Sequence, residues 1–257
     1  MRGFLLATTG VLALVAAPAF AADMAVKAPP MAAPVFTWTG FYAGLNLGGS
    51  WMRNDVTYLQ PTAAGVGVAT MQSSSVLGGG QVGYNWQVGM FVLGAEADFD
   101  GRHINADTGI TPFGGAAPAF VSLSQTENWI GTVRGRLGWA TGAQGRILIY
   151  GTGGFAYGDI QHSYLQFAGT GQSLGASDST TSTGWTAGLG LEFAVWNNLT
   201  VGIEYLHYDL GSASLGIPAA TAVGGVIFPP SSAAFNDRSD MLRVKFNWLF
   251  NGPPMMR

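Results

Sequence analysis

Hydrophobic and polar residues alternate with a period of two along much of this chain. The clearest case is Phe41, Ala43, Leu45 and Leu47, which are separated by polar or small residues. Successive side chains of a β-strand point to opposite faces of the sheet, so this pattern predicts a strand with one apolar face. The pattern recurs in residues 41–48, 76–86, 91–99, 129–139, 185–193, 199–205 and 241–250. An eighth segment, 146–158, is apolar on both faces, and its orientation stays unassigned.

The segments between these strands alternate between short and long. Short turns are predicted at residues 87–90, 141–145 and 195–198. Long segments rich in Gly, Ala, Ser and Thr cover residues 52–75, 100–126, 160–182 and 211–239. Outer-membrane barrels have short turns on the periplasmic side and long loops outside the cell. The sequence therefore predicts an all-β fold: an eight-stranded antiparallel up-and-down transmembrane β-barrel with short periplasmic turns and four long extracellular loops.

The composition fits a membrane environment. Hydrophobic residues make up 48% of the chain and charged residues only 10%, which is little charge for a soluble surface. There is no cysteine, so a lipoprotein anchor, disulfide bonds, thiolate metal sites and cysteine nucleophiles are all excluded. The formal net charge of -3 gives no attraction to nucleic acid, which we do not expect as a partner.

The charged residues of the strands decide between a soluble and a membrane barrel. They lie opposite the apolar faces, on strands that are neighbours in the predicted ring. In a soluble barrel they would face water, whereas in a membrane barrel they fill the lumen, where burial requires them to pair. We expect a lumen charge network of four acids and four bases: Glu96, Asp98, Arg134, Arg136, Glu192, Glu204, Arg243 and Lys245.

The N-terminus reads as an export signal. Arg2 precedes an apolar run, and Ala19 and Ala21 form an A-x-A cleavage pattern, so residues 1–21 are predicted to be a cleaved signal peptide. Residues 22–37 are rich in alanine and proline, which favours an extended periplasmic linker. We therefore expect the barrel at residues 38–250, a C-terminal tail at 251–257, and an outer-membrane location.

Most tryptophans lie at or near the ends of predicted strands. An amphipathic indole ring is stable at the level of the lipid headgroups, so these residues are expected to form interfacial girdles. They are Trp51, Trp86, Trp129, Trp139, Trp185, Trp196 and Trp248.

Several stretches together resemble one family. They are Trp-Thr-Gly-Phe-Tyr-Ala-Gly at 38–44, Gly-Gly-Gln-Val-Gly-Tyr-Asn-Trp at 79–86, Gly-Ala-Glu-Ala-Asp-Phe at 94–99, Thr-Val-Arg-Gly-Arg-Leu-Gly at 132–138 and Tyr-Gly-Thr-Gly-Gly-Phe-Ala-Tyr-Gly at 150–158. As a set they resemble the small eight-stranded outer-membrane proteins of alphaproteobacteria, the porin-like immunogenic surface proteins, whose barrel is similar to the membrane domain of outer-membrane protein A. The resemblance implies an outer-membrane location, a structural or weak porin-like role, and no catalytic residues.

The resemblance also bears on both ends of the chain. Proteins of this kind usually end on an aromatic residue that the barrel assembly machinery reads, which makes Phe250 the expected assembly signal, although seven residues follow it. Ala22-Asp23 resembles the mature N-terminus of related proteins that are covalently joined to peptidoglycan through an alanine. Ala22 is thus a candidate attachment point, and peptidoglycan a candidate partner.

Two motifs give weaker indications. Gly78, Gly80 and Gly83 fit G-x-G-x-x-G, but no helix follows to bind a phosphate, so no nucleotide cofactor is expected. The three histidines, His103, His162 and His207, follow or end predicted strands on the extracellular side and could gather at one rim. Surface histidines are far commoner than ligands, and we expect no metal there.

These observations favour a structural outer-membrane protein that contributes to envelope integrity and cell-surface contact. The alternative is a small porin-like diffusion channel, which would need a water path past the charged pairs and the inward-facing glycines. An outer-membrane enzyme is not expected, because no serine, histidine and acid form a catalytic signature. The expected partners are outer-membrane lipid and lipopolysaccharide, the barrel assembly machinery and peptidoglycan.

Overall fold

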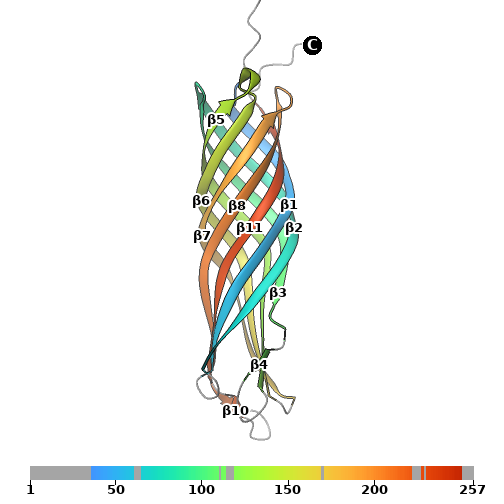
Figure 1. The fold of residues 1–257 in the computed structure, drawn as a ribbon, viewed down its shortest axis with the longest axis vertical. Helices are drawn as coiled ribbons and strands as arrows, with labels where there is room; N and C mark the ends of the chain where they lie inside the picture. The colour runs from blue at the N-terminus through green and yellow to red at the C-terminus, as the bar shows by residue number, and fades with distance from the viewer. Residues whose placement is uncertain are drawn as a thin grey trace, which may run out of the picture. The chain divides into compact units, whose positions relative to one another are not determined.

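Eight long antiparallel strands form a closed hydrogen-bonded ring in the computed structural model (Figure 1). The structure describes residues 36–60, 65–109, 111–113, 119–168, 171–221, 227–228 and 230–250. Each long strand pairs with the next one in the chain, and the last pairs with the first. The long strands are β1 (Gly40–Gln60), β2 (Gly65–Val88), β3 (Phe91–Asp107), β5 (Ala119–Thr141), β6 (Ile147–Ala168), β7 (Ser173–Ala194), β8 (Leu199–Ile217) and β11 (Ser231–Leu249). The predicted barrel is confirmed.

The remaining elements are short. Strand β4 (Thr111–Phe113) pairs with β5, and β9 (Ala220–Thr221) pairs with β10 (Ile227–Phe228) at the same end of the barrel (Figure 1). The 3-10 helix η1 (Ala143–Gly145) lies in the turn between β5 and β6. Among the described residues, no helix is long and apolar enough to cross a membrane.

The periplasmic turns are as short as the sequence predicts. Gly89 and Met90 alone connect β2 to β3, and Gly89 has φ of 63°. A two-residue hairpin needs a residue with positive φ, which glycine adopts without a steric penalty. The turn between β7 and β8 spans only residues 195–198.

The outer face of the barrel carries the apolar stripes. Large hydrophobic side chains point outward along every long strand, as with Leu45 at 70% and Leu189 at 69% exposed. Such exposure is stable in hydrocarbon and unfavourable in water. The tryptophans at both ends of this belt are also directed outward: Trp51, Trp86, Trp139, Trp185, Trp196 and Trp248.

The strands are longer and the extracellular connections shorter than predicted. Residues 52–60 and 65–75, expected as one loop, continue β1 and β2 as a hairpin. Alternation persists there, but its polarity inverts in residues 52–56: Met52 and Val56 are buried inside, whereas Arg53 and Asp55 face out. The inversion has a simple cause, because the outer face of this part meets water in place of lipid.

Beyond the membrane belt the ring separates into two sheets. Strands β2 and β3 pair only as far as Leu77 and Arg102, and β7 and β8 only as far as Trp185 and Asp209. One sheet continues with β8, β11, β1 and β2, and the other with β3, β5, β6 and β7. Apolar side chains from both sheets form a shared core between them. The external part is thus a small β-sandwich built from the strands of the barrel.

The structure also assigns the faces of the strand that the sequence left open. On β6, Leu148, Tyr150 and Ala156 are buried in the lumen, whereas Ile149 and Phe155 face outward at 55% and 51% exposure. Both faces are apolar because this strand contributes to the lipid belt and to the apolar lumen layers at once.

Candidate functional site

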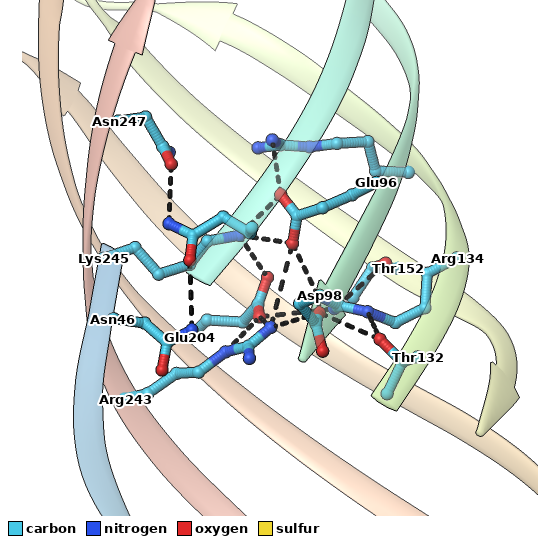
Figure 2. Close-up of polar contacts among 12 residues, drawn as sticks. Asn46, Glu96, Asp98, Thr132, Arg134, Thr152, Glu204, Arg243, Lys245 and Asn247 are labelled. Carbon is cyan, nitrogen blue, oxygen red and sulfur yellow. Dashed lines mark hydrogen bonds and ion pairs between the residues drawn. The ribbon is translucent and has the colours of Figure 1, made fainter. Parts of the chain in front are cut away.

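The lumen at the level of the membrane holds a dense network of charges (Figure 2). Among the described residues, the eight charged side chains expected there all point inward, and none is more than 5% exposed. They come from β3, β5, β7, β8 and β11. A ninth member, Asp100, was missed because the sequence placed it in a loop, whereas β3 continues to Asp107.

Arg243 lies at the centre of this network. Its guanidinium nitrogens lie 2.7 Å from Glu204, 2.8 Å from Asp98 and 2.6 Å from Asp100. Strand register explains the first contact, because Arg243 on β11 lies directly opposite Glu204 on β8. One arginine therefore links carboxylates from two separate strands, β3 and β8 (Figure 2).

Arg134 makes a second bridge across the lumen. Its Nη2 lies 2.6 Å from both Glu96 and Asp98, and its Nη1 lies 3.2 Å from Glu204. Arg134 and Glu96 are cross-strand partners on β5 and β3. The prediction that neighbouring strands supply opposite charges matches this register, and the contact to Glu204 extends the network across the barrel.

Lys245 and Arg136 complete the ion pairs. The ammonium group of Lys245 lies 2.6 Å from Glu96 and 3.3 Å from Glu204. Arg136 lies 2.8 Å from Glu192, and its guanidinium stacks 3.9 Å above the centre of the Tyr150 ring. Each of the four bases is thus paired with at least one carboxylate, which is the condition for burying charge at tolerable cost.

Neutral donors bond further carboxylate oxygens of the network, although Asp98 Oδ1 is buried without a hydrogen-bond partner among the described residues. The hydroxyl groups of Tyr42 and Tyr150 donate to Glu96 at 2.6 Å and to Glu204 at 2.7 Å. The side-chain amide of Asn46 donates to Asp100 at 2.7 Å. Buried charges surrounded by such bonds hold one fixed arrangement. The network therefore acts as a rigid polar core.

Cross-strand tyrosines occupy the space above inward-facing glycines. Tyr42 lies opposite Gly83, and a Cβ on Gly83 would come within 2.4 Å of the Tyr42 ring. Tyr150 and Gly190 form the same arrangement, with a separation of 2.2 Å. These glycines permit close packing of an aromatic ring on the neighbouring strand. The tyrosine rings fill the space that these glycines leave on the inner face.

Apolar side chains close the periplasmic mouth. Trp38 is fully buried in this cluster, where its backbone N–H donates to Gln87 Oε1 and its indole N–H to the Gly145 carbonyl, both at 2.8 Å. Phe36 packs edge-on against Trp38 with ring centres 5.0 Å apart. The full set is Phe36, Trp38, Tyr42, Val92, Ala140, Leu148, Tyr150, Ala194 and Leu249, which we call the periplasmic plug.

Two further apolar layers lie on the external side of the charge network. The nearer one contains Ile130, which lies on the inward face of β5 next to the polar Thr132. The outer one is the core of the external sandwich: Met52, Val56, Tyr58, Met71, Ile104, Ala106, Val121, Leu123, Tyr164, Ile217, Ala233 and Phe235. The lumen is therefore filled by alternating apolar and polar layers.

A second polar cluster lies between these two layers. Arg102 pairs with Glu127 at 2.5 Å, Gln125 donates to Glu127 at 3.0 Å, and His162 lies 3.0 Å from Asp237. The sequence did not predict this cluster because Arg102, Gln125, His162 and Asp237 lie in segments that were expected to be loops, whereas the strands continue through them. A β-bulge between Glu127 and Trp129 shifts the alternation by one residue, which turns Glu127 inward against the parity of its strand.

The three histidines do not meet at one rim. His162 is buried inside the sandwich, whereas His103 and His207 lie on β3 and β8, where their rings contact Asn128 at 3.3 Å and Asp240 at 2.8 Å. Within the described part of the chain, no three His, Cys, Asp or Glu side chains are grouped closely enough to hold a metal ion.

The two ends of the chain bear on the other predictions. The backbone N–H of Phe250 donates to the Phe41 carbonyl at 2.9 Å, and its side chain is 62% exposed on the barrel exterior. Its role in assembly stays a prediction. Residues 1–21, Ala22 and the tail at 251–257 lie outside the described residues.

The family model and the curated relatives that match this chain are outer-membrane proteins. The family model described as "Outer membrane protein beta-barrel domain" matches residues 7–248. The 31 kDa outer-membrane immunogenic protein of Brucella melitensis is 38% identical over 224 residues, which cover 84% of this chain and 90% of the relative. The 22 kDa outer membrane protein of Rhizobium leguminosarum is 33% identical over 193 residues, which cover 70% of this chain and 72% of the relative. The crystal structure of OprG from Pseudomonas aeruginosa aligns with a TM-score of 0.49 at 12% identity, covering 82% of this chain and 96% of that one.

Proposed function

The chain belongs to the outer-membrane β-barrel family, and from this premise we propose that it is a closed structural barrel. In this role the protein contributes to the integrity of the outer membrane and presents a folded surface to the outside of the cell. It does not conduct solutes.

The filled lumen is the observation that carries this proposal. A solute would have to pass the periplasmic plug, the charge network and the apolar layers of the external side in turn. Trp38, Arg243 and Phe235, one from each of three such layers, are all 1% exposed or less. Small barrels of eight strands have an interior that side chains can fill completely, in contrast to the wide porins.

The same packing weakens the case for a diffusion channel. Inward-facing glycines were the feature that favoured a channel at the level of the sequence. The rings of Tyr42 and Tyr150 lie over Gly83 and Gly190, and both tyrosines are also hydrogen-bonded into the charge network. Opening a path would require breaking buried ion pairs, which is strongly unfavourable.

The proposed role is non-catalytic. Among the described residues, the ring hydrogen bonds of the three histidines go to Asn128, Asp237 and Asp240, and none reaches a serine or threonine hydroxyl.

The external sandwich supports the proposed contact with the surroundings of the cell. Its apolar core is shared by two sheets, so it is a rigid extension of the barrel. Its outer face carries short polar side chains such as Ser177, Thr181 and Asn236. The Brucella relatives are named as immunogenic outer-membrane proteins, which fits a surface that is exposed at the cell exterior.

Deletion of the gene tests the proposed role. We expect the deletion strain to become more sensitive to detergents and to release more periplasmic protein, and we expect the wild-type gene to restore both. Uptake of small hydrophilic solutes should stay at the wild-type rate, because the lumen is filled. Slower solute uptake with an intact permeability barrier would contradict the proposal.

A covalent bond to the cell wall would add to this structural role. We propose that Ala22, as the mature N-terminus, is joined to peptidoglycan, with residues 22–35 as the tether, since Phe36 already packs in the periplasmic plug. An extended polyproline II segment of this length spans about 45 Å at about 3.1 Å per residue. Mass spectrometry of muropeptides should find a peptide that begins at Ala22. Its absence from purified peptidoglycan, with the protein present in the membrane, would contradict the attachment.

A further inference from the structure

A ring of polar residues surrounds the barrel just outside the external aromatic belt. Trp51, Trp185 and Tyr205 mark the level of the belt on three strands. Each of the eight strands has an outward-facing polar residue near this level, and the ring consists of Arg53, Ser74, His103, Asn128, Asp159, Thr183, His207 and Asp240. Since tryptophan and tyrosine lie at the membrane–water interface, this ring lies among the headgroups of the outer leaflet.

Two arginines lie side by side on this part of the surface. The register between β1 and β11 is the same at Trp51–Asp240 and at Thr57–Ala234, and Arg53 and Arg238 occupy corresponding positions of the two strands in the stretch between these paired residues. Both side chains face outward, and Arg238 is 60% exposed. Like charges at directly opposed positions of a sheet are destabilising unless an anion offsets them.

The surrounding acids leave Arg53 without a partner. Asp209 pairs with Arg238 at 2.8 Å, Asp240 is bonded to His207 and Tyr205, and Asp55 accepts a bond from Thr70. Within the described part of the chain, Arg53 has no ion pair. Its neighbour across β2 is Gln72, a further outward donor.

We propose that Arg53, Arg238 and Gln72 bind a phosphate monoester of an outer-leaflet lipid, the group carried by lipid A of lipopolysaccharide. Guanidinium groups bind phosphate oxygens in a bidentate manner. A monoester, with a charge of about -1.5 to -2, accepts stronger charge-assisted bonds from these donors than a phospholipid diester with its single charge. Below the site, the exposed side chains of Trp51, Leu47 and Val244 form an apolar strip for the acyl chains. The proposal rests on the orientation of the barrel and is independent of whether the lumen is closed.

Binding of defined lipids to the refolded full-length barrel tests the site. The probes are phosphorylated lipid A, dephosphorylated lipid A and phosphatidylglycerol, and native mass spectrometry reports the bound fraction. Phosphorylated lipid A should bind most tightly. Arg53→Gln should weaken it about tenfold, as expected for the loss of one charge-assisted contact, and the Arg53→Gln/Arg238→Gln double variant should weaken it further.

Two controls make the outcome decisive. Arg146→Gln changes an arginine beside the turn at the opposite end of the barrel, where it bonds Asn197, and should leave lipid A binding within about twofold of wild type. Because Arg53 has no ion pair to lose, Arg53→Gln should fold normally even where the double variant does not. Equal binding of phosphatidylglycerol and lipid A, or unchanged binding by Arg53→Gln, would overturn the proposal.

Discussion

Replacing Arg243 with methionine is expected to lower the free energy of unfolding by about 3–5 kcal/mol, the range for removing one partner of a buried ion pair. Arg243 is within 3 Å of Glu204, Asp98 and Asp100, so all three carboxylates would lose a cationic partner. Methionine fills similar volume but offers no positive charge. Urea unfolding in phosphatidylcholine vesicles, followed by tryptophan fluorescence, measures the change.

Arg238→Met is the matched control on the same strand. Arg238 makes one ion pair, with Asp209, and its side chain is 60% exposed, so its loss should cost no more than about 1 kcal/mol. Equal destabilisation by the two methionine variants would show that the lumen network does not stabilise the barrel. An Asp100→Asn change in the Arg243→Met background should recover part of the loss, because Arg243 is the one ion-pair partner of Asp100 among the described residues.

Replacing Trp38 with alanine is expected to destabilise the barrel by about 3–5 kcal/mol, as do other truncations of large buried aromatic residues. Trp38 is fully buried in the periplasmic plug, and its indole donates to the Gly145 carbonyl. The variant would leave a cavity beneath Phe36 and an unpaired carbonyl. The same urea titration measures the change in the free energy of unfolding. The urea concentration at the midpoint should be lower than in the wild type, as in the Arg243→Met variant.

Trp196→Ala provides the comparison for this result. Trp196 lies in the turn between β7 and β8 at the same end of the barrel, but it is 64% exposed. Its removal should cost less than the removal of Trp38, because Trp196 is not among the packed side chains of the periplasmic plug. If Trp38→Ala were as mild as Trp196→Ala, the periplasmic plug would not be a packed part of the fold.

The fold was predictable from the sequence wherever lipid determines the outer face. A strand such as Phe41 to Leu47 shows the full contrast between apolar and polar faces, because one face meets hydrocarbon and the other the polar lumen. Past Trp51 the outer face meets water and the inner face an apolar core. The apolar Met52 therefore faces inward and the charged Arg53 outward, the reverse of the pattern in the membrane. The alternation was still present there, but a prediction based on lipid-facing stripes treated it as loop.

The lumen network was predictable for a related reason. Charged residues that lie opposite a lipid-facing stripe have no place but the interior, and cross-strand neighbours such as Glu96 and Arg134 follow from hairpin geometry. Contacts across the barrel, such as Arg243 with Asp98, depend on side-chain length and barrel curvature, which no local pattern records. Glu127 was hidden by a β-bulge, since one inserted residue reverses the parity of its strand.

The closed lumen is the central claim, and single-channel recording tests it most directly. Refolded protein with confirmed barrel structure is added to a planar lipid bilayer, and current is measured over a range of voltages. We predict no steady conductance steps for the wild type, because the plug, the charge network and the external apolar layers all fill the interior. Stable ohmic openings that change in size when Arg134 and Arg136 are replaced by serine would contradict the account and show a water path through the barrel.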